Sequence, residues 1–306
     1  MTRLFFGAYA LLRVLTSRRS RSLRLYMNRN VRARAARIAA GILHRVLSNI
    51  ASPLEVRVRS GEPTILNLNG VLLRADATNR YWKVAWEPSN QGARIAQALD
   101  GLGIQPKSVL DIGANVGEIA LYFACIAGSH RVVAVEPSRR NLELLDYHAS
   151  LLNGNPANLR ILPYAITGDG KPLAIYGSGG TTTAHPVSPR TQEQGICPSK
   201  TLEGLWGDLD DPEVDFVKVD IEGGEPDLAP MLGGVLGHTK SWLVEFGVNR
   251  PRADYLSLLR VFLDNGFRAI QWSNGKELSS LPEAEQSLIG DARSEPEDVL
   301  FVRKCP

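Results

Sequence analysis

The stretch that decides the fold is Asp111-Ile112-Gly113-Ala114-Asn115-Val116-Gly117. The apolar run at 109–112 predicts a buried strand, and residues 118–126 have the spacing of a helix. Gly113 and Gly117 allow a tight turn and a close approach of the backbone to a ligand. Because the N–H groups at a helix start attract negative charge, the stretch predicts a strand–turn–helix unit that holds a small anionic group.

Two acidic residues accompany this turn, each at the end of an expected strand. Asp111 offers a negative charge that could hold an ammonium group. Glu136 follows the apolar run at 132–135 and lies 23 residues after Gly113, the span expected for a loop, a helix and a strand. An acid at this place can accept hydrogen bonds from both hydroxyls of a ribose. The turn has neither the G-x-G-x-x-G order nor a G-K-[ST] ending, which disfavours a dinucleotide site and a P-loop.

A third block of charge is Lys218-Val219-Asp220-Ile221-Glu222-Gly223-Gly224-Glu225. Lys218, Asp220 and Glu222 alternate, so they should point to one side of a strand or of its end. Charged groups are costly inside a parallel sheet unless they are paired or used, and ligands bind at the carboxyl ends of such strands. Two interpretations stay open: a polar wall that faces hydroxyl groups of a ligand, and a salt-bridge network that anchors the following helix.

Short apolar runs alternate with helical spacing throughout 104–306, which we expect to form one domain. Strands are expected at 109–112, 131–135, 159–162, 214–221, 242–246, 267–272 and 299–303, and helices at 118–126, 139–152 and 255–265. This alternation predicts a mostly parallel α/β sheet with helices on both faces. The stretch at 177–198, rich in Gly, Ser, Thr and Pro, is expected to be a long loop.

A small β extension and a helix are expected ahead of this domain, over residues 54–103. Apolar runs within 64–74 flank Asn69-Gly70, the dipeptide that favours a tight hairpin. Helical spacing follows at 91–102.

Residues 1–53 read as a basic, amphipathic helical arm. The first 50 residues hold eleven arginines and no acidic residue, whereas the rest of the chain has more acidic than basic residues. Such an arm fits an anionic membrane surface, its own domain or a second subunit, and its apolar run at 4–12 is too short to span a bilayer. With only 3 cysteines the chain suits a reducing compartment, so we expect a cytoplasmic protein, or one peripheral to the inner face of a membrane.

The three blocks, 111–117, then Val135-Glu136-Pro137, then 218–225, resemble the FkbM-type family of class I S-adenosylmethionine-dependent methyltransferases. The first two blocks are shared by many class I methyltransferases, and the third is specific to this family. The resemblance covers about residues 80–303 and leaves out the basic arm. It implies a seven-stranded, mostly parallel Rossmann-like sheet, S-adenosylmethionine as cofactor, and methylation of a hydroxyl of a sugar, glycan or secondary metabolite.

The resemblance also implies which residues bind the cofactor. Those implied for the methionine end are Asp111, Gly113, Asn115 and Gly117, and Glu136 is implied for the ribose. Glu87 is added because Trp86-Glu87-Pro88 resembles the acidic segment that precedes the first block in this family. The chain departs from the family after Glu245, where Phe246 and Gly247 stand in place of a frequent histidine.

A hydroxyl is a poor nucleophile until its proton leaves, so a positioned base is expected. Asp220 is the first candidate and Glu222 the second, with Lys218 neutralising one of them or orienting the acceptor. His185, in the expected long loop, is a further candidate base. Asp220, Glu222 and Glu245 could also converge on a divalent metal, but they match no ligand signature, so no metal is assigned.

Two other functions fit parts of the sequence. A nucleic-acid methyltransferase could use the arginine-rich arm as its handle, although the third block is not the [ND]-P-P-[YF] type and the rest of the chain has no basic excess. A non-catalytic methyltransferase-like scaffold, recruited through the arm, is the second alternative. The intact cofactor blocks disfavour that scaffold.

Overall fold

The computed structural model describes residues 64–68, 71–75, 91–152, 156–178, 181–183, 192–247, 252–278, 280–289 and 297–304. The chain divides into two units, Met1–Glu62 and Pro63–Pro306, and every described residue belongs to the second. The predicted basic arm, Glu87 and His185 lie outside the described residues, so the predictions about them stay untested. Within the described ranges, no helix has both the length and the apolarity to cross a bilayer.

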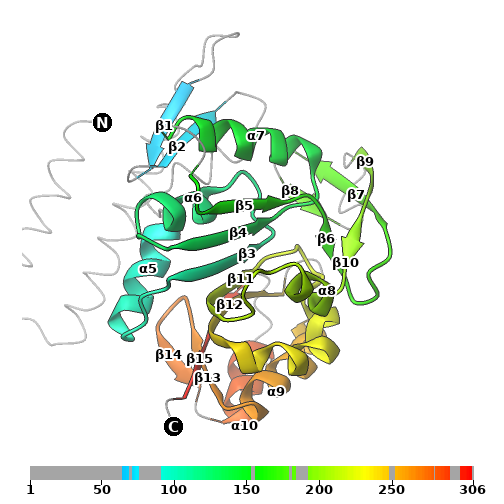
Figure 1. Ribbon diagram of the computed structural model, residues 1–306. Helices are drawn as coiled ribbons and strands as arrows, with labels where there is room; N and C mark the ends of the chain where they lie inside the picture. The colour runs from blue at the N-terminus through cyan, green and yellow to red at the C-terminus, as the bar shows by residue number, and fades with distance from the viewer. Residues whose placement is uncertain are drawn as a thin grey trace, which may run out of the picture. The chain divides into compact units, whose positions relative to one another are not determined.

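An eight-stranded sheet organises the described part of the second unit (Figure 1). In spatial order its strands are β14 (Lys276–Leu278), β13 (Phe267–Gln271), β15 (Glu297–Arg303), β12 (Thr239–Phe246), β11 (Val214–Val219), β3 (Ser108–Ile112), β4 (Arg131–Val135) and β5 (Leu159–Leu162). The five strands from β12 to β5 are parallel, whereas β15 runs antiparallel to both of its neighbours. The prediction of a mostly parallel α/β sheet is therefore confirmed.

The predicted number of seven strands is wrong by one, because β13 continues into a hairpin with β14. The connection runs from Trp272 to Gly275 and ends in Asn274 and Gly275. Asn274 Oδ1 accepts the N–H of Lys276 at 2.8 Å, and Gly275 has a φ of +68°. Asn-Gly is itself a hairpin signal, but a second strand of only three residues is too short to show a period.

Alternation along the strands divides the apolar side chains between two cores, one on each face of the sheet. On β3, Val109 belongs to one core and Leu110 to the other. The helices packed into the core of Val109 are α5 (Gln91–Gly101), α6 (Glu118–Cys125) and α7 (Arg139–Ser150). Those packed into the core of Leu110 are α8 (Leu202–Gly207), the 3-10 helix η1 (Glu225–Gly234), α9 (Leu256–Asp264) and α10 (Leu281–Ala284). Helices thus cover both faces, as predicted.

The same alternation directs several charged residues to one face. Asp111 lies two residues after Val109, so its side chain points toward the face of α5 and α6. Lys218 on β11 lies opposite Asp111 in the strand register. Glu245 on β12 lies opposite Asp298 on β15. Charges from four neighbouring strands therefore gather near the carboxyl end of the parallel strands.

The expected long loop at 177–198 is wrong where the chain is described. β7 (Leu173–Ser178), β8 (Thr181–Thr183) and β9 (Gln192–Cys197) form a three-stranded antiparallel sheet, and β6 (Ala165–Ile166) pairs with β10 (Ser199–Lys200). The threonines of β8 favour extended backbone, but three residues give too short a pattern to outweigh the surrounding Gly and Pro. Pairing with β7 decides their structure.

The predicted hairpin before the main domain is confirmed. β1 (Thr64–Leu68) and β2 (Val71–Ala75) pair antiparallel with Leu68 opposite Val71, so Asn69-Gly70 is the two-residue connection. Val71 is fully buried and packs with Leu121 of α6 and Ala149 of α7. The predicted boundaries at residues 53 and 103 stay predictions.

Candidate functional site

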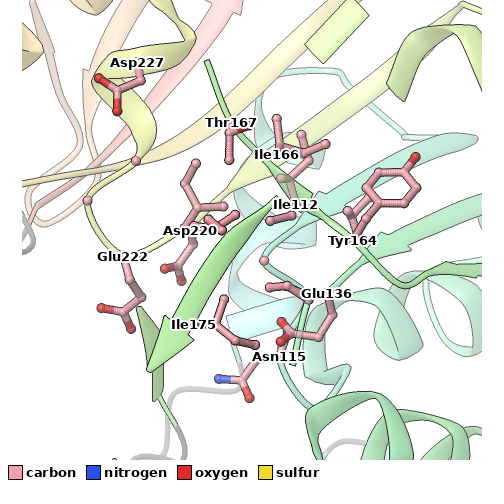
Figure 2. Close-up of a pocket in the computed structure, with 18 of the residues that line it drawn as sticks. Ile112, Asn115, Glu136, Tyr164, Ile166, Thr167, Ile175, Asp220, Glu222 and Asp227 are labelled. Atoms are coloured by element: carbon pink, nitrogen blue, oxygen red, sulfur yellow. The ribbon is translucent and has the colours of Figure 1, made fainter. Parts of the chain in front are cut away.

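A cavity of about 510 Å³ opens at the carboxyl ends of β3, β4 and β11, the edge at which parallel α/β sheets bind ligands (Figure 2). Its walls come from the loops after these strands, from residues after β5, and from β7. The polar side chains that line it belong to Asn115, Glu136, Asn141, Tyr164, Thr167, Tyr176, Asp220, Glu222 and Asp227.

The structure brings most of the predicted site residues to this cavity. Those that line it are Gly113, Asn115, Glu136, Asp220 and Glu222. Asp111, Gly117 and Lys218 lie behind its wall. They are not among the lining residues, although each lies within two residues of one in the chain. Two loops hold most of the predicted site residues: residues 113–117 after β3, called the β3 loop, and residues 220–224 after β11, called the β11 loop.

The β3 loop turns through two glycines that no other residue could replace without strain. Gly113 has a φ of +83°, and a Cβ there would lie 1.8 Å from the carbonyl oxygen of Asp220. Gly117 has a φ of +92°, and a Cβ there would lie 2.8 Å from Cγ of Leu145. Backbone with positive φ is open to glycine at no steric cost. The two loops therefore touch at Gly113, where the first passes directly over the backbone of the second.

Asp111 caps the helix that follows the β3 loop. Its side chain is 1% exposed, and its Oδ2 accepts the N–H of Ala120, in the first turn of α6, at 3.1 Å. Among the described residues its Oδ1 has no hydrogen-bond partner. Burial raises the pKa of Asp111 to about 6. A buried oxygen without a partner is costly, so this position fits a further hydrogen-bond donor.

Glu136 faces the cavity while it also holds the β3 loop. One carboxylate oxygen accepts the N–H of Asn115 at 2.9 Å, and the other accepts the N–H of Ser138 at 2.8 Å and Nδ2 of Asn141 at 3.2 Å. Burial raises the pKa of Glu136 to about 7. A carboxylate offers about four acceptor sites, so one of them is left for a ligand donor. The predicted contact of Glu136 with the two ribose hydroxyls stays a prediction.

Lys218 lies behind the cavity wall and holds Asp220. Its Nζ donates to Oδ2 of Asp220 at 2.9 Å, and its side chain is almost fully buried. Burial alone lowers the pKa of Lys218, but the negative charges of Asp220 and Asp111 outweigh burial and raise that pKa above its usual range. Lys218 is thus a fixed positive charge between the two loops, and it reaches the cavity only through Asp220.

Glu222 is presented to the cavity by an unusual backbone. It has a φ of +57°, and the next residue, Gly223, has a φ of +105°. Burial, with repulsion from Asp220 and Glu225, raises the pKa of Glu222 to about 7. A non-glycine residue in this conformation is strained and persists only where its surroundings fix it, often at functional sites.

Behind the β11 loop lies a pair of acids, one of which the sequence analysis missed. Burial, with repulsion from Asp220 and Glu222, raises the pKa of Glu245 far above its usual range. Asp298, opposite Glu245, has its pKa raised to about 6 by burial first and by Asp220 second. Nothing near Asp298 in the sequence marks it, because only the antiparallel insertion of β15 beside β12 brings it here. Within the described ranges, no three or more His, Cys, Asp or Glu are arranged to hold a metal ion.

Five further polar residues that line the cavity were not predicted from the sequence: Asn141, Tyr164, Thr167, Tyr176 and Asp227. Tyr164 and Thr167 follow β5, and Asp227 lies in the first turn of η1. The place of Tyr164 just after an expected strand is a usable signal, since strand ends meet at this edge. Asp227 has no such signal, because the fold of residues 221–227 decides where its side chain lies.

The sequence matches a known family over more than half of its length. Residues 111–269 match the family described as the methyltransferase FkbM domain. No curated protein was found to match the chain.

Similar solved structures include three methyltransferases. For the methyltransferase FkbM from Methylobacillus flagellatus KT the identity is 15%, the match covers 65% of this chain and 44% of that chain, and the TM-score is 0.40. For magnesium protoporphyrin IX methyltransferase from Synechocystis PCC 6803, with bound SAM, these values are 14%, 75%, 87% and 0.42. For an rRNA methylase from Streptococcus thermophilus they are 10%, 70%, 98% and 0.42. These TM-scores are too low to support an argument about function.

Proposed function

Because the chain belongs to the FkbM family of methyltransferases, we propose that it transfers the methyl group of S-adenosylmethionine to a hydroxyl oxygen of a sugar, glycan or secondary metabolite. The observation that carries this proposal is that one cavity has two chemically different sides. Figure 2 shows Glu136 and Asn115 on one side and Asp220 and Glu222 on the other. The first side suits the hydroxyls of an adenosyl ligand, and the second supplies the base that a hydroxyl acceptor needs.

The residues of the β3 loop fit the cofactor. S-adenosylmethionine, when bound, supplies an electrophilic methyl group on a sulfonium centre. Glu136 would accept a hydrogen bond from one ribose hydroxyl at its remaining acceptor site. Asp111 Oδ1, which has no partner among the described residues, would attract the ammonium group from behind the loop. Ile112 and Val135 give this side of the cavity apolar walls.

The residues of the β11 loop would prepare the acceptor. Its hydroxyl must lose a proton as the oxygen bonds to the methyl group, and the proton would pass to the carboxylate of Glu222. A pKa of about 7 suits this task near neutral pH. Asp220 is already bonded to Lys218, so we assign it the orientation of the acceptor rather than the role of first base that the sequence favours. Lys218 fixes the carboxylate of Asp220 in this arrangement.

A screen with methyl-labelled S-adenosylmethionine against sugars, lipid-linked glycans and polyketides tests the proposal. We expect a labelled ether product, and we expect Glu222→Gln to lower its rate of formation by about 100-fold or more. Calorimetry with S-adenosylhomocysteine should show that this variant keeps its cofactor affinity. If the chain does not bind S-adenosylmethionine, the cofactor assignment fails. If it binds the cofactor but labels no acceptor, the non-catalytic scaffold gains support.

The eleven arginines of residues 1–50 support a second candidate, methylation of nucleic acid. Filter binding of RNA and DNA at two salt concentrations separates the candidates. Strong, salt-dependent binding that is lost when residues 1–50 are deleted would favour a nucleic-acid acceptor. Against it, the charged side chains that line the described cavity belong to four acids, Glu136, Asp220, Glu222 and Asp227.

For the arm itself we propose attachment to an anionic membrane surface on the cytoplasmic side, with docking on its own domain or on a second subunit as the alternatives. Its arginines and its apolar stripe support this proposal. In liposome flotation, the full chain should rise with vesicles that contain phosphatidylserine and stay behind with neutral ones. The chain without residues 1–50 should stay behind in both cases. Equal flotation of both forms would overturn the membrane proposal.

A further inference from the structure

The β11 loop is held from behind by a buried glutamate that is not part of the cavity wall. Glu225 is 0% exposed and is absent from the residues that line the cavity. Its Oε1 accepts the N–H of Ile221 at 2.8 Å, and its Oε2 accepts the N–H of Gly223 at 3.1 Å. These two N–H groups flank Glu222 on either side. One carboxylate therefore holds the backbone both before and after the strained residue.

A tyrosine from another element completes this arrangement. The hydroxyl of Tyr255, the residue just before α9, donates to Oε2 of Glu225 at 2.8 Å. Tyr255 is also fully buried, and its ring packs against Phe246 at the end of β12, with ring centroids 4.8 Å apart. Glu225 is thus tied to α9 and to β12 through Tyr255. All three groups bonded to Glu225 are donors, which favours the ionised carboxylate and opposes the effect of burial, which raises the pKa of Glu225 above its usual range.

The arrangement explains how Glu222 keeps its conformation. A non-glycine residue at positive φ is strained, so it needs surroundings that fix its conformation. Two charge-assisted hydrogen bonds to the neighbouring N–H groups provide that constraint. Without them the loop could relax to a conformation in which the Glu222 side chain no longer faces the cavity.

We propose that Glu225 and Tyr255 are a positioning pair that holds the Glu222 carboxylate toward the acceptor side of the cavity. The inference rests on the proposed function, in which Glu222 is the base. Neither member touches the cavity, so both act through the β11 loop. The pair affects the reaction in two ways. It holds Glu222 in position, and Glu225 is also one of the groups that raise the pKa of Glu222.

The charge effect gives a measurable signature. The groups that act on Glu222 are Asp220 and Glu225, which raise its pKa, and Lys218, which lowers it, while Glu222 in turn raises the pKa of Glu245. Glu225→Gln removes one negative neighbour and keeps the size of the side chain. The titration midpoint of Glu222 should therefore move to lower pH. A role limited to stability would not move it.

The test uses the full chain with Glu225→Gln, Tyr255→Phe and the matched control Tyr122→Phe, whose tyrosine lies in α6. We expect Glu225→Gln to lower kcat by about 10- to 100-fold through misplacement of Glu222. Tyr255→Phe, which removes one hydrogen bond, should lower kcat by about three- to tenfold. Both variants should bind S-adenosylhomocysteine as the wild type does in calorimetry, and Tyr122→Phe should match the wild type throughout.

A readout without turnover separates this inference from the proposed function. Carbon-13 NMR of labelled glutamate follows the Glu222 carboxyl, with Glu222→Gln used to assign its resonance. A lower midpoint in Glu225→Gln and a displaced resonance in Tyr255→Phe support the pair, even if no acceptor is ever found. If Glu225→Gln does not fold, Tyr255→Phe decides alone. Unchanged Glu222 titration and an unchanged ratio of kcat to KM in the folded variants would overturn the inference.

Discussion

The β3 loop and the β11 loop both contain a residue with positive φ that a buried glutamate helps to hold, but the two glutamates lie in different places. Each follows one of two neighbouring parallel strands, and each contains one non-glycine residue with positive φ, Asn115 at +52° and Glu222 at +57°. Each is also held by a buried glutamate: Glu136 accepts one N–H of the β3 loop, and Glu225 accepts two N–H groups of the β11 loop. In both loops this arrangement presents one side chain, that of Asn115 or Glu222, at the carboxyl end of the sheet.

The two loops differ in where the holding glutamate lies. Glu136 is itself part of the cavity wall, so it can bind a ligand and hold its loop at once. Glu225 is sealed behind its loop and leaves the cavity to Glu222. Under the proposed function, Glu136 combines binding of an uncharged part of the ligand with a structural role. Glu222 would take up a proton, and a separate residue, Glu225, holds it in place.

The largest expected effect comes from a substitution at Gly113, where the two loops touch. Gly113→Ala would drive a Cβ into the carbonyl oxygen of Asp220, 1.8 Å away, at a φ of +83°. We expect a loss of about 3 to 4 kcal/mol in the free energy of unfolding, measured by urea denaturation. Gly101→Ala, where a Cβ meets nothing within 4 Å, is the control and should change it by less than about 0.5 kcal/mol. Equal behaviour of the two variants would show that the loops do not pack in this way.

The second largest effect is expected in cofactor affinity, from a substitution of Glu136, which holds the β3 loop. Glu136→Gln replaces an acceptor oxygen by a donor and so disturbs both the bond to Asn115 and the site left for a ligand. We expect the affinity for S-adenosylhomocysteine to fall by about 10- to 100-fold in calorimetry. Glu143→Gln, at an exposed position of α7, is the control. An unchanged affinity in Glu136→Gln would contradict the proposal that the adenosyl ligand binds on this side of the cavity.

A smaller effect should follow from His148, which supports the β3 loop from α7. His148 is fully buried, and its Nδ1 lies 2.8 Å from the carbonyl oxygen of Val116. His148→Phe leaves that oxygen without its donor, so we expect the unfolding free energy to fall by about 1 to 3 kcal/mol. The exposed His130 offers the control, since His130→Phe removes no buried bond. Equal losses in the two variants would argue that His148 contributes packing only.

The smallest expected effect is on the pH dependence of stability, and it arises from Glu222 in the β11 loop. The pKa of Glu222 rises from its ordinary 4.5 to about 7, mainly through burial. Between these pH values the folded chain keeps a proton that the unfolded chain has lost. The contribution of Glu222 to stability is therefore fully present below about pH 4.5 and is lost as pH rises to about 7.

Glu222→Gln has no such proton to lose, so its stability should change less between pH 4.5 and pH 7. Denaturation curves across this range should show the variant gaining about 1 to 2 kcal/mol on the wild type toward neutral pH. Glu143→Gln again serves as the exposed control. A parallel pH dependence of Glu222→Gln and the wild type would mean that the Glu222 carboxyl is well solvated.

Local signals predict much of this fold, because they depend on neighbours in the chain. The strand at 131–135, the helix start at Ser138 and the hairpin around Asn69-Gly70 follow from apolar period, capping and turn chemistry. Ser138 accepts the N–H of Asn141, as an N-cap does. Where the pattern is only three residues long, as in β8 and β14, pairing with a longer strand decides the structure and the sequence signal fails.

The sequence by itself determined that acids and glycines stand at the ends of successive strands, and it thereby predicted a ligand site at the carboxyl edge of a parallel sheet. The tertiary structure decided which of those ends meet. β11 inserts beside β3, so Gly113 lies against Asp220 and Lys218 against Asp111, although about a hundred residues separate them. Long-range packing likewise brings Tyr255 and Asp298 to the region behind the β11 loop. The physical reason is that strand order depends on long-range packing, which no local period encodes.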